Sequence, residues 1–174
     1  SVWIATLNEG LFRWDATTDK MSHLLLDTLP DHRIKAIAMD EEGFVWLGTG
    51  DDGLVRLQTS PGIKTDRIFR INEGVPGNRI ARLKTDPTDR LWVSTQNGLA
   101  WFDPKAGRFI QPVNHYLLPD RKLEANALAF GNDGHLIVGQ RAGFSILKIP
   151  SIEPARQVPL RLTSFRVHEE PLSL

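Results

Sequence analysis

The sequence predicts an all-β fold, a fragment of a β-propeller, because it repeats itself about every 45 residues and because strand-like segments fill each repeat. The repeat is clearest at two positions, one mostly tryptophan and one always glycine. The first recurs in steps of 43, 46 and 45 residues, and the second in steps of 43, 45 and 45. The tryptophan position holds Trp3, Trp46, Trp92 and Ile137, and the glycine position holds Gly10, Gly53, Gly98 and Gly143. Such a period is typical of propellers and solenoids.

The second repeat shows what fills the period. Runs of alternating β-branched and apolar residues occupy 34–39, 45–49, 54–57 and 67–71. The turn 40–43 reads Asp-Glu-Glu-Gly, in which Asp can bond its own backbone and Gly accepts positive φ. Asn-Gly and Asp-Gly pairs after the tryptophan runs favour two-residue hairpins. Four antiparallel strands per repeat predict one propeller blade.

The repeats set the expected organisation of the chain. The predicted units are a partial blade at 1–33, blades at 34–79, 80–124 and 125–150, a linker at 151–159, and the first strand of a following domain at 160–174. The chain opens on the second strand of a blade. We therefore expect the C-terminal blades, about four, of a larger, seven-bladed propeller. In the last copy Ile137 replaces Trp, and Gly131 stands where Asp40 and Asp86 occur, which is typical of a terminal repeat.

The repeated tryptophans have two interpretations, a carbohydrate-binding platform or packing between blades. Trp3, Trp46 and Trp92 occupy one blade position among apolar neighbours, which favours burial between blades. The pattern leaves Trp14 and Trp101 undecided. Asp40, Asp86 and Asp133 precede the tryptophan position in successive repeats, and we interpret them as turn residues rather than as catalytic acids.

Composition excludes several classes of protein. Lys plus Arg and Asp plus Glu both number 21, so no field of one sign predicts nucleic acid or an anionic membrane as partner. The chain has no cysteine, which excludes disulfides and thiol chemistry. Its five histidines lack any short ligand spacing. The sequence therefore predicts no metal, no cofactor and no catalytic residue, and a membrane only through a segment outside this chain.

Two short motifs imitate enzyme sites. Gly48–Gly53 matches the dinucleotide fingerprint, but that motif must open a helix, and a strand follows it here. Ser145 and Lys148 match Ser-x-x-Lys, yet residues three apart on a strand point to opposite faces. Neither motif predicts catalysis.

Strand direction predicts where a ligand would bind. The links between blades and the hairpins after the tryptophan strands must share one face of the propeller. Its candidate ligand-binding residues are Arg33, Asp51, Asp52, Asn78, Arg79, Gln96, Asn97, Gln140 and Arg141. This mixture of amides, guanidiniums and carboxylates favours a polyhydroxylated or anionic small ligand, although exposed loops are polar in any case.

A family resemblance rests on the same residues. The second repeat reads Asp40-x-x-Gly43-x-x-Trp46-x-Gly48-Thr49 followed by Gly53-Leu54, and the link after it reads Asn72-Glu73-Gly74-Val75-Pro76-Gly77-Asn78. This pattern resembles the two-component regulator propeller repeat over residues 1–150. Val158–Val167 is similar to the first strand of the immunoglobulin-like three-tyrosine domain that follows such propellers. The resemblance implies a periplasmic sensor ectodomain of a bacterial transmembrane signalling protein.

The resemblance implies a non-catalytic, ligand-sensing segment whose output, a histidine kinase or a diguanylate cyclase, lies elsewhere. Its signal would be a carbohydrate, another small solute or a partner protein. Two alternatives stay open: a propeller enzyme of lyase or glycosidase type with its site on the link face, and a scaffold that binds only protein. Because a cut propeller exposes apolar blade faces, we also expect pairing with the remaining blades of the same protein, with a second copy as a homodimer, or with the 160–167 strand.

Overall fold

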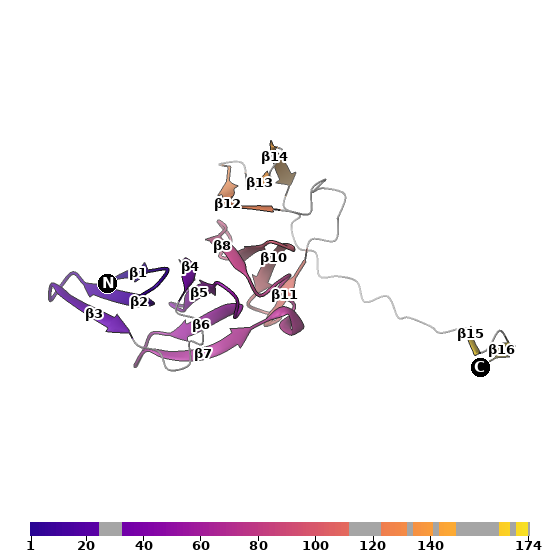
Figure 1. The fold of residues 1–174 in the computed structure, drawn as a ribbon, viewed down its shortest axis with the longest axis horizontal. Coiled ribbons are helices and arrows are strands. Elements are labelled where there is room, and N and C mark those ends of the chain that lie inside the picture. Colours follow the sequence, from indigo (N-terminus) through magenta and orange to yellow (C-terminus); the bar gives the residue numbers. More distant parts are fainter. Residues whose placement is uncertain are drawn as a thin grey trace.

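The computed structural model describes residues 1–24, 33–111, 123–131, 134–140, 143–148, 164–167 and 170–173. Antiparallel sheets follow one another in chain order along an arc (Figure 1). Blade 1 comprises β1 (Val2–Ala5), β2 (Leu11–Asp15) and β3 (Lys20–Leu24). Blade 2 comprises β4 (Ile34–Met39), β5 (Val45–Thr49), β6 (Leu54–Gln58) and β7 (Lys64–Phe69).

Blade 3 comprises β8 (Ile80–Thr85), β9 (Leu91–Thr95), β10 (Gly98–Asp103) and β11 (Arg108–Ile110). Blade 4 comprises β12 (Leu123–Phe130), β13 (His135–Gln140) and β14 (Gly143–Lys148). One 3-10 turn, η1 (Ile71–Glu73), lies in the link between blades 2 and 3. The prediction of an all-β fold made of repeated antiparallel blades is confirmed. Among the described residues, blades 2 and 3 have four strands each, and blades 1 and 4 have three.

The hairpin lengths differ between blades. In blade 3, Thr95 pairs with Gly98, so the turn has the two residues that were expected, but they are Gln96 and Asn97 and not the Asn-Gly pair, whose Gly98 begins β10. In blade 2, Gly48 pairs with Leu54, and the backbone N–H of Thr49 donates to Gly53 at 3.0 Å, so three residues form the turn. The prediction of a two-residue hairpin is therefore wrong for the Asp-Gly pair of blade 2, where one further loop residue precedes the glycine.

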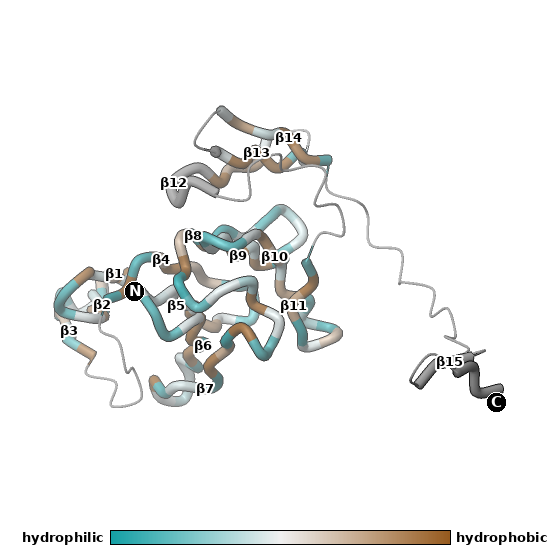
Figure 2. Tube along the Cα trace, turned by 45° about the vertical axis from the view of Figure 1, so that its right-hand side comes forward, coloured by the Kyte–Doolittle hydropathy of each residue, from teal (hydrophilic) through white to brown (hydrophobic). Residues whose placement is uncertain are grey.

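The interface between blades 2 and 3 contains the largest apolar cluster. Trp46 is only 1% exposed and lies between Phe69 of its own blade and Phe102 of the next, at ring-centroid distances of 5.5 and 5.0 Å. The first contact is stacked and the second is tilted, and both add to the transfer energy of the buried rings. Hydrophobic and hydrophilic segments alternate along the tube of the blades (Figure 2). The burial of Trp46 between Phe69 and Phe102 confirms the prediction that it packs between blades.

The interface between blades 3 and 4 repeats this arrangement. Trp92 is 2% exposed, and its ring lies 5.0 Å from that of Trp101 and 6.2 Å from that of Phe130 in blade 4. Trp101 is buried as well. Trp101 is therefore a core residue, whereas Trp14 stays partly exposed and donates its indole N–H to Asp19 at 3.1 Å.

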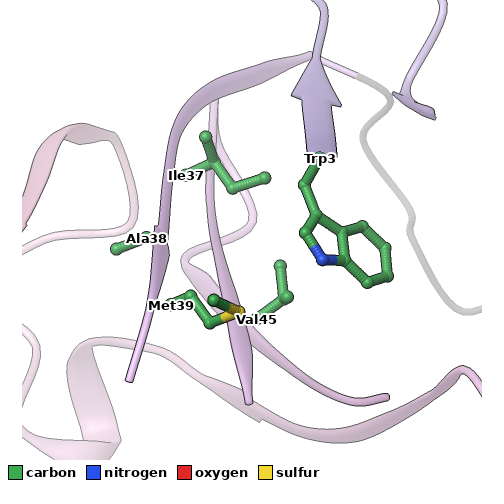
Figure 3. A pocket seen from close by; sticks show the side chains of 5 residues that line it. All are labelled: Trp3, Ile37, Ala38, Met39 and Val45. Carbon is green, nitrogen blue, oxygen red and sulfur yellow. The ribbon is translucent and has the colours of Figure 1, made fainter. Parts of the chain in front are cut away.

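Trp3 corrects the expectation that all three repeated tryptophans are buried equally, because it is only partly buried. It packs toward blade 2, where it lines a cavity of about 220 Å³ together with Ile37, Met39 and Val45. Figure 3 shows the indole of Trp3 across this cavity from the side chains of β4 and β5. Trp46 is surrounded by Phe69 of its own blade and Phe102 of the next blade. At the equivalent repeat positions around Trp3 stand two smaller residues, Leu24 and Leu57. These leucines fill less of the space, so the indole keeps contact with solvent.

The C-terminal segment contains a hairpin of its own. β15 (Ser164–Val167) pairs antiparallel with β16 (Glu170–Ser173) in a two-stranded sheet. The segment predicted as a single first strand therefore contains two paired strands, and β15 pairs with β16 rather than with a blade edge. The 151–159 linker and Asp133 lie outside the described residues. Assignment of the segment to an immunoglobulin-like domain stays a prediction.

Candidate functional site

The ends of the strands place the loops on two opposite faces of the blades. On the turn face, which carries the β4–β5 and β8–β9 turns, the backbone N–H of Glu41 donates to the Asp89 carboxylate at 3.2 and 3.1 Å. On the link face, the backbone N–H of Gly50 donates to the backbone carbonyl of Arg33 at 3.0 Å. The backbone N–H of Gly53 donates to the backbone carbonyl of Asn78 at 2.8 Å on the same face. The hairpins after the tryptophan strands and the links between blades therefore share one face, as strand direction predicts.

Asp86 shows how the turn face uses its carboxylates. One oxygen accepts the backbone N–H groups of Thr88 and Arg90 and the Thr88 hydroxyl, at 2.8, 3.0 and 2.7 Å. The other accepts from Arg90 Nε at 2.6 Å and from the Trp92 indole at 2.9 Å. Burial favours the neutral form of Asp86, but the hydrogen bonds from Trp92, Thr88 and Arg90 outweigh it and lower its pKa. All five of these hydrogen bonds come from residues of its own hairpin.

Asp40 has the same role with fewer partners. Its carboxylate accepts the backbone N–H of Phe44 at 2.8 Å and the indole N–H of Trp46 at 2.7 Å. In blade 4, Gly131 and Ile137 occupy the corresponding pair of positions. The side chain of Ile137 has no N–H donor, so the carboxylate and the indole are absent together. The interpretation of Asp40 and Asp86 as turn residues is incomplete, because each also accepts the indole six residues later; the repeated spacing of six was the signal.

The link face brings together three of the candidate ligand residues. The Asp51 carboxylate forms an ion pair with Arg33 through one oxygen and with Arg79 Nε at 3.3 Å through the other. The three side chains are between 51% and 53% exposed. Arg33 precedes β4, Asp51 lies in the β5–β6 loop, and Arg79 precedes β8, so three separate loops converge. The cluster brings two guanidinium groups to one carboxylate, and guanidinium groups are the donors that bind planar anionic groups in a bidentate way.

A threonine and a glycine hold the β5–β6 loop in place. The Thr49 hydroxyl donates to Gly53 at 2.8 Å and accepts the backbone N–H of Asp52 at 2.9 Å. Gly53 has φ of 90°, and a Cβ there would lie 2.3 Å from the carbonyl oxygen of Phe69. Thr6 and Thr95 make the same kind of hydroxyl bond to Gly10 and Gly98 in their own hairpins, at 2.9 and 3.3 Å. These threonines were not predicted as structural residues, although the Trp-x-x-Thr spacing repeats.

The other candidate residues do not all join the cluster. The Asn78 side chain accepts the backbone N–H of Ile71 at 3.0 Å, which assigns it to the link itself. Gln96 and Asn97 are exposed on the blade 3 hairpin, and Asp52 is half-buried. Gln140 ends β13, its side chain is outside the described part of the structure, and so is the whole of Arg141. Among the candidate residues whose side chains the structure describes, Arg33, Asp51 and Arg79 are the three that form ion pairs with one another.

Another arginine that was not predicted, Arg56, lies away from the link face. Its guanidinium bonds the Asp66 carboxylate at 2.7 and 2.6 Å. The same group lies over the rings of Phe44 and Trp46, at 4.6 and 5.4 Å from their centroids. Cation–π contact and the ion pair together stabilise this half-buried charge. Arg56 is therefore part of the blade packing.

In the part of the chain that the structure describes, the His, Asp and Glu side chains form no group of three that could hold a metal ion. No helix formed by the described residues is long and apolar enough to cross a membrane.

Residues 28–51 match the family model described as two component regulator propeller. This match includes the β4–β5 turn, Trp46 and Asp51, but covers a small part of the chain. No curated protein sequence matches the chain.

Several solved structures share the fold. The extracellular domain of BT3049 from B. thetaiotaomicron, described as a hybrid two component system, is 21% identical with a TM-score of 0.64, over 84% of this chain and 18% of that chain. The extracellular domain of BT4673 from B. thetaiotaomicron, described as a one component system, is also 21% identical with a TM-score of 0.64, over 87% and 23%. Virginiamycin B lyase from Staphylococcus aureus is 16% identical with a TM-score of 0.56, over 86% and 52%.

The chain spans about a fifth of the length of the two extracellular domains that it matches. At such identities the likeness concerns the fold alone. Together the family model, the structural neighbours and the repeated blades show a β-propeller similar in fold to the extracellular domains of a hybrid two component system and a one component system.

Proposed function

We propose that this chain is a ligand-sensing β-propeller segment of a periplasmic sensor domain in bacterial transmembrane signalling, with a histidine kinase or diguanylate cyclase output elsewhere in the protein. The observation that carries the proposal is the convergence of Arg33, Asp51 and Arg79 on the link face. The similarity to the extracellular domains of a hybrid two component system and a one component system supports the location and the signalling role.

The ligand class follows from the charges. A ligand carboxylate or sulfate can take over the guanidinium donors that Asp51 now engages, in the planar geometry that arginine favours. The exchange costs little, because ion pairs between exposed side chains contribute about 0 to 1 kcal/mol. Neighbouring hydroxyl groups of a sugar would find amide partners at Gln96 and Asn97, which are exposed. We therefore propose an acidic saccharide or a similar small anion as the signal.

Calorimetric titration with D-glucuronate and with D-glucose tests the proposal, because the two sugars differ by one carboxylate. Glucuronate should bind more tightly than glucose. Arg79→Ala should weaken glucuronate binding by about tenfold or more, since a charge-assisted hydrogen bond contributes ~1.5–3 kcal/mol. Arg108→Ala is the matched control, because Arg108 is exposed at the start of β11, beside the turn that joins it to β10. Equal losses in the two variants would contradict a site on the link face.

A change at Asp51 separates an anionic ligand from a neutral one. If the ligand carboxylate competes with Asp51, Asp51→Asn should strengthen glucuronate binding severalfold, because it removes the internal competitor. If the site instead recognises hydroxyl groups, the same change should weaken binding, because a carboxylate accepts hydroxyl donors better than an amide does. The direction of the change therefore identifies the ligand class.

The fold similarity to virginiamycin B lyase keeps a propeller enzyme as the second candidate. Acid–base catalysis needs a carboxylate or histidine free to transfer a proton. The best-placed carboxylate of the link face, Asp51, is engaged by two guanidiniums, an arrangement that favours binding over proton transfer. Turnover of a bound sugar that disappears in Asp51→Asn would support the enzyme instead.

A further inference from the structure

Blade 2 carries a lysine at an irregular place in its first strand. The pairing of β4 with β5 shifts between Ile34 and Ala36, so Lys35 is the extra residue of a β-bulge. The neighbouring side chains agree with this insertion. Ile34 packs in the apolar cluster shared with blade 1 and Ala36 in the cluster shared with blade 3, whereas residues i and i+2 of a regular strand point to the same side. Lys35 therefore stands outside the regular alternation of β4.

The first strands of the blades surround the axis of the propeller. β4 and β8 are edge strands of their sheets, β4 contacts β8, and β8 contacts β12. Edge strands that lie together in this way line the central channel of a propeller. A lysine that bulges from such a strand can extend its ammonium group into the channel, because its stem is long and flexible. Lys35 is half-buried, and no ion pair among the described residues involves it.

Arg82 of blade 3 lies next to this bulge. Its Nη1 donates to the backbone carbonyl of Lys35 at 3.4 Å, across the contact between β4 and β8. The pairing of β8 with β9 shifts at the same repeat position, between Ile80 and Arg82. Ala81 is the extra residue there, so blade 3 repeats the bulge without its lysine. The two blades thus bring one lysine and one arginine together on the axial side.

These two residues continue the arginine cluster of the link face toward the interior of the propeller. Arg33 and Arg79 stand immediately before β4 and β8, and Lys35 and Arg82 follow them two and three residues later. An extended chain advances about 3.3 Å per residue, so the two pairs lie about 7 to 10 Å apart. Residues 33–39 and 79–85 contain five basic residues and no acidic one, although the whole chain is balanced. Charges of one sign along a channel focus their field on an anion that enters it.

We propose that Lys35 and Arg82 form a second anion subsite, on the axial side of the cluster of Arg33, Asp51 and Arg79. One anionic group of the ligand engages the arginines of the link face, and a second group, about 7 to 10 Å away, engages Lys35 and Arg82. The ligand class is therefore a sugar diacid or an acidic oligosaccharide rather than a sugar with a single carboxylate. This inference rests on the proposed function, because the first group binds at the site proposed there.

Calorimetric titration with D-glucarate and with D-gluconate tests the subsite, because the two acids share an open six-carbon chain and differ by the second terminal carboxylate. Glucarate should bind about tenfold or more tightly, since it gains a charge-assisted hydrogen bond. Lys35→Met should remove this advantage and leave gluconate binding unchanged, because methionine keeps much of the apolar stem and lacks the charge. Lys105→Met is the matched control, since Lys105 is exposed on the β10–β11 turn, on the opposite face.

A gain of binding provides a second readout. Ala81→Lys places a lysine on the equivalent bulge of blade 3 and should strengthen glucarate binding severalfold relative to gluconate, because it adds a cation to the same channel. Equal affinities for the two acids in the unaltered protein would overturn the subsite. So would an advantage of glucarate that persists in Lys35→Met or is lost equally in Lys105→Met. Failure of the proposed function is distinguishable, because Arg79→Ala would then bind gluconate as tightly as the unaltered protein does.

Discussion

Two carboxylates on opposite faces of the blades separate folding from proposed binding. The Asp86 side chain on the turn face is 1% exposed and accepts five hydrogen bonds from its own hairpin. The Asp51 side chain on the link face is 51% exposed and lies between arginines of two different links. The first carboxylate has no capacity left for a ligand, whereas the second can be displaced from its partners. Polar residues that repeat with the blade therefore serve the hairpins, and those that converge from separate loops are the ones available to a ligand.

The largest expected effect lies in the buried aromatic layer joined to the turn face. Trp46→Ala should lower the free energy of unfolding by about 3 to 5 kcal/mol, through lost transfer energy and a cavity. Ile137→Ala, at the equivalent position of blade 4, should cost roughly half as much or less, because Ile137 is only partly buried. Urea unfolding of both variants measures the difference. Equal losses would contradict the unequal packing of these two blades.

The next effect concerns the Asp86 hairpin itself. Asp86→Asn should lower the free energy of unfolding by about 2 to 3 kcal/mol, because it weakens the bonds to Arg90 and Trp92 inside a buried site. Asp40→Asn should lower the free energy of unfolding by about 1 kcal/mol, since the Asp40 carboxylate accepts only two hydrogen bonds, from Phe44 and Trp46, and is only partly buried. Chemical unfolding at neutral pH gives both values. A larger loss of stability in Asp40→Asn than in Asp86→Asn would contradict the view that hydrogen bonds to the carboxylate stabilise these turns.

The loss of stability in acid should reveal the contribution of the Asp86 carboxylate. The pKa of Asp86 is lower in the folded chain than its ordinary value of 3.8. The stability that its charged form contributes is therefore fully present above about pH 3.8 and is lost as the pH falls through the folded pKa. Thermal unfolding across this window should be less pH-dependent in Asp86→Asn than in the unaltered chain. The pKa of Asp15 is lowered by the backbone N–H of Thr17, and because both proteins keep Asp15, the difference isolates Asp86.

The smallest effect on stability is expected on the link face. Arg79→Ala should change the free energy of unfolding by less than about 0.5 kcal/mol, because its side chain is 53% exposed and its ion pair with Asp51 is screened by solvent. Thermal unfolding without ligand checks this. A loss as large as that of Asp86→Asn would show that the arginine cluster holds the blades together instead of serving a ligand.

Sequence patterns predicted the blades well because the repeat fixes both strand and turn positions. The burial of Trp46 and Trp92 follows from apolar neighbours that recur in each copy. The partial exposure of Trp3 could not be predicted in the same way, because it depends on the size of a side chain in the following blade. That side chain is Leu57 beside Trp3, whereas the equivalent residue beside Trp46 is the larger Phe102. The hairpin hydrogen bonds of Thr49 were missed for a similar reason, since a hydroxyl beside a glycine gives no hydrophobic signal.

The link face shows the limit more clearly. Strand direction predicted which loops share this face, and the structure confirms that they do. Strand direction did not predict that Asp51 would pair with both Arg33 and Arg79, because that contact depends on loop conformations held by the turn hydrogen bonds of Thr49 and Gly53. Asn78 belonged to the same list, but its amide is used within the link. Local pattern thus identified the loops, while long-range geometry selected the residues.

Mapping amide chemical shifts during a titration with D-glucuronate tests the division between the two faces most directly. The account predicts that the largest shifts occur at amides of the link face, around Gly50, Gly53 and Arg79, and that those of the turn face, around Gly43 and Thr88, stay unchanged. Arg79→Ala should remove the shifts and Arg108→Ala should preserve them. Shifts centred on the Asp40 and Asp86 turns would contradict the account.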